Sequence, residues 1–229
     1  MFENRREAGK LLAEKLSNFR KDKEALVLGI TRGGVVVAFE IAKKLHIPLD
    51  IIIIKKIGAP GNPELAIGAV GPKKVIYWEK DLLKKTVSGS KYRKKASEIK
   101  IKEREELEEF LRGPISSPLR QGSAGRARLR RIKKKKPLEV RGKKVILVDD
   151  GVATGATVLC ALKFLRKEKS REVILAAPVI ARDTYLNIKK YFDTVTVMVI
   201  PERLYAIGQF YREFGQVENE EVKDIIDKQ

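Results

Sequence analysis

Residues 145–157 read VILVDDGVATGAT, and this stretch decides the predicted fold. Four apolar residues, three of them β-branched, run into Asp149 and Asp150, and a turn of small residues follows. Such a run indicates a buried strand that passes through a turn into a helix. Because the first turn of a helix has backbone N–H groups without intrahelical acceptors, the turn is suited to hold an anion such as phosphate.

The two aspartates add a second property to this turn. A carboxylate repels phosphate but accepts hydrogen bonds from two vicinal hydroxyl groups, whereas the hydroxyl groups of Thr154 and Thr157 can donate to an anion. The turn has no lysine and lacks the dinucleotide-binding glycine spacing, so it is neither a P-loop nor a Rossmann fingerprint. We therefore expect a sugar phosphate. In the alternative, the aspartates only cap the helix, which leaves the spacing of threonine and glycine unexplained.

Short apolar runs rich in β-branched residues recur along the chain. They alternate with amphipathic stretches that indicate helices ending near Leu45 and Lys167 and covering 182–191. Parallel strands that are buried on both faces give continuous apolar runs of this kind. We predict an α/β fold with a mostly parallel sheet and helices on both faces. The predicted strands are 25–30, 49–54, 144–149, 172–180 and 194–200.

A second glycine-containing loop follows the first predicted strand. Residues 31–34 read TRGG; glycine lets the backbone approach an anion, and arginine can bind phosphate oxygens in a fork. Lys55 and Lys56, at the end of the second predicted strand, add positive charge. Ligands of open parallel sheets bind at the carboxyl ends of the strands, so the loops predict a sugar phosphorylated at both ends. Alternatively, the glycine pair only forms a tight turn.

The composition describes one basic domain of medium size. The chain has 229 residues, and 49 Lys and Arg against 30 Asp and Glu give a net charge of +19. That excess attracts polyanions, which include phosphorylated ligands, nucleic acid and acidic membranes. We expect the single cysteine, Cys160, to be buried and the single histidine, His46, to lie on the surface. The longest apolar stretch, 173–181, is too short to span a bilayer and no signal peptide is visible, so we expect a cytoplasmic protein.

The middle of the chain has a different character. Residues 79–112 are helical in pattern and densely charged, and 113–138 contain nine Lys and Arg and no acidic residue. We predict a single domain, 1–229, with a core at about 21–200 and a basic insertion or loop at 113–136. A solvated loop is one interpretation of this segment. A nucleic-acid-binding arm is the other, although the segment has no aromatic residues for base stacking.

Motifs outside 113–131 resemble one family. The stretch 145–157 is similar to the 5-phosphoribosyl 1-pyrophosphate (PRPP) signature of type I phosphoribosyltransferases. The chain most resembles the small bacterial and archaeal members whose acceptor is mostly unassigned. Further stretches that carry the resemblance are FENRREAG at 2–9, RGGV at 32–35, KKIGAP at 55–60, PELAIGAV at 63–70 and GQFYREFGQ at 208–216.

The resemblance implies a type I phosphoribosyltransferase fold with a small hood, and a PRPP site. Asp149 and Asp150 would hold the 2′ and 3′ hydroxyl groups of the ribose, and the following loop the 5′-phosphate. The 31–34 loop would hold the pyrophosphate, where the family often has a cis peptide bond. Arg32, Asp149 and Asp150 would be the catalytic residues. The PRPP-binding set would be Thr31, Arg32, Gly33, Gly34, Lys55, Lys56, Asp149, Asp150, Gly151, Ala153, Thr154, Gly155, Ala156 and Thr157.

The reaction implied is the displacement of pyrophosphate from C1′ of PRPP by a nitrogen of a base. Mg²⁺ would arrive with PRPP, near Asp149 and Asp150, with few direct protein ligands. The protein would be a cytoplasmic homodimer that acts in nucleotide metabolism.

The acceptor would lie under a hood built from the C-terminal and middle segments. Tyr205, Phe210 and Tyr211 follow the last predicted strand in a stretch that we expect to be helical, and a flat base stacks well on an aromatic ring. Alternatively, these rings pack the segment onto the core. Ala153 stands where 6-oxopurine members have an acidic base, which disfavours a hypoxanthine or guanine acceptor that uses that base. The region 79–112 would supply a loop that closes over PRPP.

Two hypotheses about function follow. In the first, the protein is a Mg²⁺-dependent phosphoribosyltransferase. In the second, it is a PRPP or nucleotide sensor that binds nucleic acid through its basic surface, and its binding would weaken steeply with salt.

Overall fold

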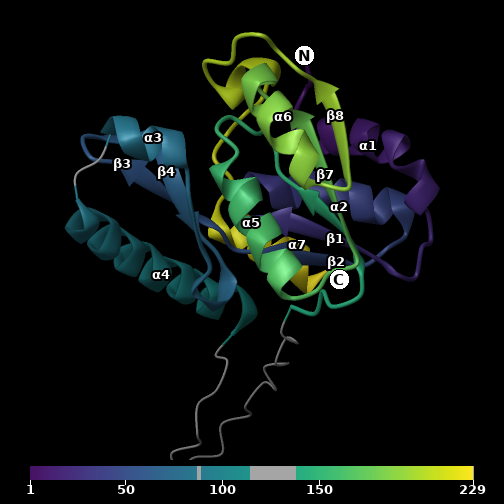
Figure 1. The fold of residues 1–229 in the computed structure, drawn as a ribbon. Helices are drawn as coiled ribbons and strands as arrows, with labels where there is room; N and C mark the ends of the chain where they lie inside the picture. The colour runs from purple at the N-terminus through teal and green to yellow at the C-terminus, as the bar shows by residue number, and fades with distance from the viewer. Residues whose placement is uncertain (87–88, 114–137, 229) are drawn as a thin grey trace, which may run out of the picture.

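A five-stranded parallel sheet forms the centre of the computed structural model, which describes residues 1–86, 89–113 and 138–228 (Figure 1). The strand order is β2-β1-β6-β7-β8, and each neighbouring pair is parallel. The predicted parallel sheet is therefore confirmed. The strands are β1 (Ala25–Ile30), β2 (Leu49–Ile52), β6 (Lys144–Val148), β7 (Glu172–Val179) and β8 (Thr194–Val199).

Helices cover both faces of this sheet, as predicted. Consecutive residues of a strand point to opposite faces. Leu28 in β1 packs in the cluster that contains residues of α5 (Ala156–Lys167). Its neighbour Val27 packs in the cluster that contains residues of α1 (Arg5–Lys15) and α2 (Gly33–Leu45). Because both sides of the strand are covered, the strand sequence is apolar throughout rather than alternating.

The strand order reverses beside β1, and this positions the site. The chain leaves β1 for β2 on one side, and later returns to place β6 on the other side. Gly29 in β1 is in register with Val148 in β6, so the loops that follow these strands begin at the same level. In open α/β sheets, ligands bind at such a switch point.

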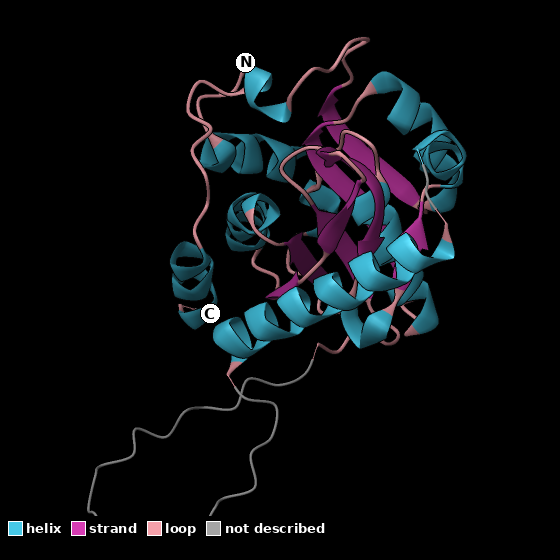
Figure 2. Cartoon of the chain, turned by 90° about the vertical axis from the view of Figure 1, so that its left-hand side faces the viewer, coloured by secondary structure: helices cyan, strands magenta, loops and turns pink. Residues whose placement is uncertain are grey.

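A second, antiparallel sheet lies beside the first and was not predicted. It contains β3 (Lys55–Ala59), β4 (Asn62–Val70) and β5 (Ile76–Trp78). The predicted strand 49–54 was therefore too long, since β2 ends at Ile52 and Lys55 opens a new strand. The charged region 79–112 forms α3 (Lys80–Thr86) and α4 (Ser90–Arg112), and residues of both pack against this sheet. Figure 2 shows α4 crossing the side of the molecule that faces the viewer.

The N-terminal residues lie beside the segment that follows β8. The amide of Phe2 donates to the carbonyl of Phe210 at 2.8 Å, and the amide of Arg212 donates to the carbonyl of Phe2 at 2.9 Å. Beyond this pairing, α7 (Asn219–Asp227) packs in a cluster with residues of α2 and α4. The expected helix at 182–191 is α6 (Arg182–Ile188) followed by a 3₁₀ turn.

Other expectations can be compared with the described residues. Cys160 is buried and His46 is exposed, as predicted. No helix in the described ranges is long and apolar enough to cross a membrane. The basic segment predicted at 113–136 lies outside the described residues, apart from Gly113.

Candidate functional site

The loops that follow β1 and β6 touch each other. A Cβ atom on Gly33 would lie 1.9 Å from Oδ2 of Asp150, so only glycine allows this approach. Gly34 packs in the same way, because a Cβ there would lie 2.9 Å from Cα of Asp149. The peptide bond between Thr31 and Arg32 is cis, as in the loop that the resemblance names. The two predicted loops therefore form one structure around the two aspartates.

Asp149 is a buried carboxyl group, with 9% of its surface exposed. Its Oδ1 accepts a hydrogen bond from the amide of Asp150 at 3.0 Å, and its Oδ2 accepts one from the hydroxyl of Thr157 at 3.3 Å. Burial, and then the neighbouring charge of Asp150, raise the pKa of Asp149 to about 8, against an opposing effect of Lys56. Asp149 thus carries a proton over much of the neutral range.

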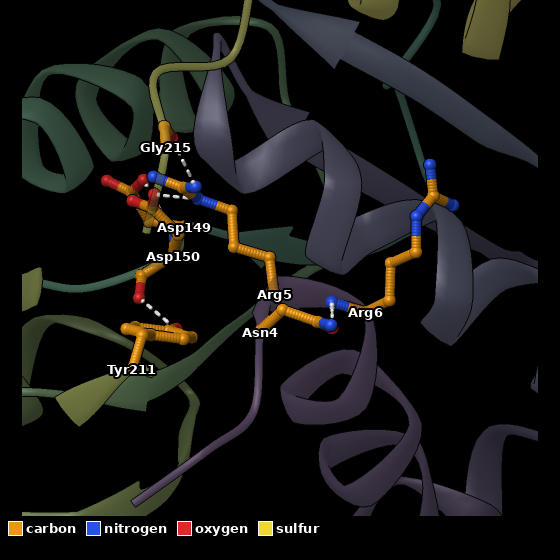
Figure 3. Close-up of polar contacts among 7 residues, drawn as sticks. All are labelled: Asn4, Arg5, Arg6, Asp149, Asp150, Tyr211 and Gly215. Carbon is orange, nitrogen blue, oxygen red and sulfur yellow. Dashed lines mark hydrogen bonds and ion pairs between the residues drawn. The ribbon is translucent and has the colours of Figure 1, made fainter. Parts of the chain in front are cut away.

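Asp150 is held by a residue from the start of the chain. Nε of Arg5 donates to Oδ2 of Asp150 at 2.7 Å, and Nη1 of Arg5 donates to the carbonyl of Gly215 at 2.8 Å (Figure 3). The guanidinium group also lies over the ring of Phe214, 3.8 Å from its centre. On the backbone side, the hydroxyl of Tyr211 donates to the carbonyl of Asp150 at 2.6 Å. The start of α1 and the segment that follows β8 therefore fix this aspartate.

A cavity of about 630 Å³ opens onto both loops, and we call it the main cavity. Cations from four elements or loops face it, together with both aspartates, and this charge suits a polyanionic ligand. Burial is the first cause that lowers the pKa of Lys55, and Arg32 and Lys100 act in the same direction. The cavity is lined by Arg5, Ile30, Thr31, Arg32, Gly33, Ile54, Lys55, Lys56, Pro63, Lys100, Glu103, Leu107, Asp149, Asp150, Gly151, Thr157, Ile207, Phe214 and Asn219.

The turn into α5 has an N-terminus suited to an anion. Gly155 adopts a positive φ of 81°, a conformation that other residues rarely take, and α5 begins at the next residue. No side chain of the described residues caps this helix, so its first N–H groups are left for a ligand or water. The carbonyl of Ala153 accepts a hydrogen bond from the hydroxyl of Thr184. Thr157 lines the main cavity, but five other predicted PRPP-binding residues do not: Gly34, Ala153, Thr154, Gly155 and Ala156.

The proposed acceptor rings are not in the lining of the main cavity. Tyr205 is 83% exposed, and Phe210 ends a 3₁₀ turn in a segment that is otherwise irregular rather than helical. Tyr211 is buried and stacks on Phe214, so it packs this segment onto the core. The aromatic residue that does line the cavity is Phe214.

Sequence reasoning also missed Arg5, Lys100, Glu103 and Ile207 as lining residues. Arg5 and Phe214 belong to stretches that carry the family resemblance, which could have marked them. Lys100 and Glu103 lie in α4, and the density of charged residues in this helix gives no sign of which ones face a cavity.

Comparisons with known proteins agree with this geometry. The family model described as "Phosphoribosyl transferase domain" matches residues 3–206. Two proteins from two strains of Mycobacterium tuberculosis, both named "Putative phosphoribosyl transferase", are 36% identical over 228 residues. That alignment covers 100% of this chain and 47% of each relative, so the chain spans about half the length of these curated relatives.

A solved structure is similar over the whole chain. The crystal structure of the protein TT1426 from Thermus thermophilus has 32% sequence identity and a TM-score of 0.73. The match covers 100% of this chain and 98% of that one.

Proposed function

Because this chain belongs to the phosphoribosyl transferase family, we propose that it transfers the 5-phosphoribosyl group of PRPP to a nitrogenous base and releases pyrophosphate. The observation that best supports this reaction is the arrangement of the main cavity. Two adjacent carboxyl groups, the side chain of Thr157 in the first turn of α5 and a set of cations line this one cavity. PRPP has a diol between a phosphate and a pyrophosphate, and these are groups that such a lining can bind.

The aspartates would bind the ribose, and the start of α5 the 5′-phosphate. The carboxyl oxygens of Asp149 and Asp150 accept hydrogen bonds from hydroxyl groups. The uncapped N–H groups of α5 and the hydroxyl of Thr157 would donate to the phosphate oxygens, where the helix dipole adds partial positive charge. These contacts hold the ribose so that C1′ faces the remaining part of the cavity.

The leaving pyrophosphate would lie against the cations of the 31–34 loop and β3. Arg32, Lys55 and Lys56 all line the main cavity, and positive charge placed where negative charge develops lowers the barrier. Burial lowers the pKa of Lys55, and an anionic ligand at this place favours the protonated form of the lysine. Lys55 would therefore bind pyrophosphate as a cation.

Mg²⁺ fits the two carboxyl groups at the diol position, because it prefers oxygen ligands and keeps several waters. The part of the chain that the structure describes has no group of three or more His, Cys, Asp or Glu side chains that could hold a metal. Asp149 and Asp150 would thus supply at most part of the coordination, and PRPP and water the rest. When bound, the ion would supply positive charge that stabilises the leaving pyrophosphate.

Titration calorimetry of PRPP into the protein, with Mg²⁺ in the buffer, tests this proposal without knowledge of the acceptor. We expect binding in the wild type and loss of binding in the Asp149→Asn/Asp150→Asn double variant. Asp183→Asn is the matched control, because Asp183 is an exposed carboxylate in the first turn of α6 and should leave binding unchanged. A folded wild-type protein that takes up no PRPP would refute the proposal.

The resemblance also implies a homodimer, a cytoplasmic location and a part in nucleotide metabolism, and these stay predictions. The alternative hypothesis, a PRPP or nucleotide sensor that binds nucleic acid, rests on the net charge of +19 and on a basic segment that lies mostly outside the described residues. Salt-sensitive binding of RNA together with PRPP binding but no pyrophosphate release with any base would favour it.

A further inference from the structure

The outer side of α4 carries a line of exposed charged residues, which we call the α4 stripe. Figure 1 shows α4 at the edge of the molecule, and Figure 2 shows it along the side that faces the viewer. Neighbouring members of the line are three or four positions apart, so they share one side of the helix. Three lysines and three glutamates leave the stripe without net charge, in a chain whose net charge is +19. The α4 stripe consists of Lys91, Lys95, Glu98, Lys102, Glu106 and Glu109.

The order of these charges does not stabilise the helix that carries them. Lys91 lies in the first turn of α4 and Glu109 in the last turn, whereas the helix dipole favours the reverse. Lys102 and Glu106 lie 3.8 Å apart, but with the lysine on the N-terminal side, which is the weaker order for such a pair. Lys91, Lys95 and Glu109 form no ion pair with any side chain in the described ranges. These charges are therefore available to a partner.

The α4 stripe is complementary to a second copy of itself. From Lys91 to Glu109 its signs run plus, plus, minus, plus, minus, minus, and the reverse order has every sign inverted. Two antiparallel copies related by a two-fold axis near Lys100 would therefore place each lysine opposite a glutamate. Lys94 and Glu105, which flank the stripe on one side, would face each other as well. The facing pairs within the stripe are Lys91 with the partner's Glu109, Lys95 with the partner's Glu106, and Glu98 with the partner's Lys102.

Two exposed apolar side chains flank the stripe on its other side. Ile99 is 48% exposed and Phe110 is 41% exposed, and they are eleven positions apart, which is about three turns of helix. The same two-fold axis would bring Ile99 against the partner's Ile99. It would also bring Phe110 beside the partner's Tyr92, at a cavity of about 340 Å³ between α4 and β3. The axis that pairs the charges therefore also covers these apolar groups. The cavity is lined by Ile57, Gly58, Tyr92, Lys95, Ala96, Ile99 and Lys100.

We propose that two copies of this chain form a dimer through their α4 stripes, with the two helices antiparallel. The family resemblance implies a homodimer but no particular surface, and the α4 stripe supplies one. The proposal needs no ligand, so it does not depend on the proposed function. Because the contact is symmetric, each pair of charges occurs twice in the dimer. Complementary charges at the contact also offset the repulsion between two strongly basic chains.

Charge-reversal variants test the pairing, with sedimentation velocity over a range of protein concentrations as the measurement. We expect the wild type to be a dimer. Lys91→Glu/Lys95→Glu and Glu106→Lys/Glu109→Lys each replace four attractive pairs of the dimer by four repulsive ones. Each double variant should raise the dissociation constant of the dimer about a hundredfold or more.

Two rescue experiments distinguish pairing from damage to the fold. An equal mixture of the two double variants should form a heterodimer, because every reversed charge then faces its opposite. All four substitutions in one chain should restore the homodimer for the same reason. Lys10→Glu/Lys15→Glu is the matched control, because it reverses two exposed lysines of α1, on the far side of the molecule in Figure 1, and should stay dimeric.

Three results would overturn the proposal. The first is a wild type that stays monomeric at every concentration, including one that binds RNA or another protein through the α4 stripe instead. The second is a dimer that both double variants retain, because the dimer then uses another surface. The third is a dimer that the double variants lose but that neither the mixture nor the fourfold variant restores. A heterodimer from the mixture, with both double variants monomeric alone, supports the proposed pairing.

Discussion

Replacement of Asp149 by asparagine should change how the stability of the protein depends on pH. Burial and the charge of Asp150 raise the pKa of Asp149 from 3.8 to about 8 in the folded chain. The folded chain therefore binds this proton more tightly than the unfolded chain. The resulting stabilisation is fully present below about pH 4 and is lost as the pH rises through about 8.

The size of the effect follows from the same two pKa values. Each pH unit between them is worth about 1.4 kcal/mol for one proton. From pH 6 to pH 9, the free energy of unfolding of the wild type should fall by about 3 kcal/mol because of this group alone. Asparagine resembles the protonated acid, because it is neutral and its Oδ1 can still accept from the Asp150 amide. The Asp149→Asn variant should therefore lack this loss.

Urea denaturation followed by circular dichroism, at pH 6 and at pH 9, measures the difference. We expect the variant to keep its stability between the two pH values, so that its advantage over the wild type grows by about 3 kcal/mol from pH 6 to pH 9. Asp183→Asn, in an exposed position, should follow the wild type at both pH values. If wild type and Asp149→Asn lose the same stability between the two conditions, Asp149 is ionised throughout and the reasoning is refuted.

Three further predictions concern the packing around the site. Gly33→Ala should lower stability by about 1–3 kcal/mol and weaken PRPP binding in calorimetry, because the new Cβ would lie 1.9 Å from Oδ2 of Asp150. Gly89→Ala is the control and should do neither, because a Cβ there would have no other atom within 4 Å. Tyr211→Phe should cost about 1–3 kcal/mol in urea denaturation, because the Asp150 carbonyl loses its 2.6 Å hydrogen bond; an unchanged midpoint would contradict this. Burial raises the pKa of the Cys160 thiol to about 12. A disulfide reagent at pH 8 should therefore label this thiol only after the protein unfolds. Rapid labelling of the folded chain would contradict the buried position.

The central sheet could be predicted because each strand carries its own signal. Ala25–Ile30 is apolar at every position except Gly29, and the strand has the predicted bounds. Burial on both faces produces such runs, and this condition is local to each strand. The predicted C-terminal bound of the second strand was wrong, because an apolar run does not show where a strand ends. Ile53 and Ile54 continue the apolar run, but they pack in two different clusters after β2 has ended.

The antiparallel sheet could not be predicted for a related reason. Its longest strand, β4, is buried at five consecutive positions, 66–70, so it shows no alternation of polar and apolar residues. Close packing also requires a residue without a side chain in this strand. A Cβ on Gly68 would lie 2.6 Å from the Trp78 ring, which belongs to the neighbouring strand. Close packing of this kind depends on the partner strand, so the sequence of β4 alone does not reveal it.

The candidate site likewise has a part that the sequence predicted and a part that it did not. The half that would hold the phosphoribosyl group comes from two loops that follow neighbouring strands, and contiguous motifs indicated it. The hydrogen bonds of Arg5 join it to Asp150, 145 positions away, and to Gly215, 210 positions away. No local periodicity connects residues that far apart; they come together because Phe2 and Glu3 pair with the segment 210–213. The switch point between β1 and β6 is a property of the fold, whereas the position of Asp150 depends on the side chains of Arg5 and Tyr211.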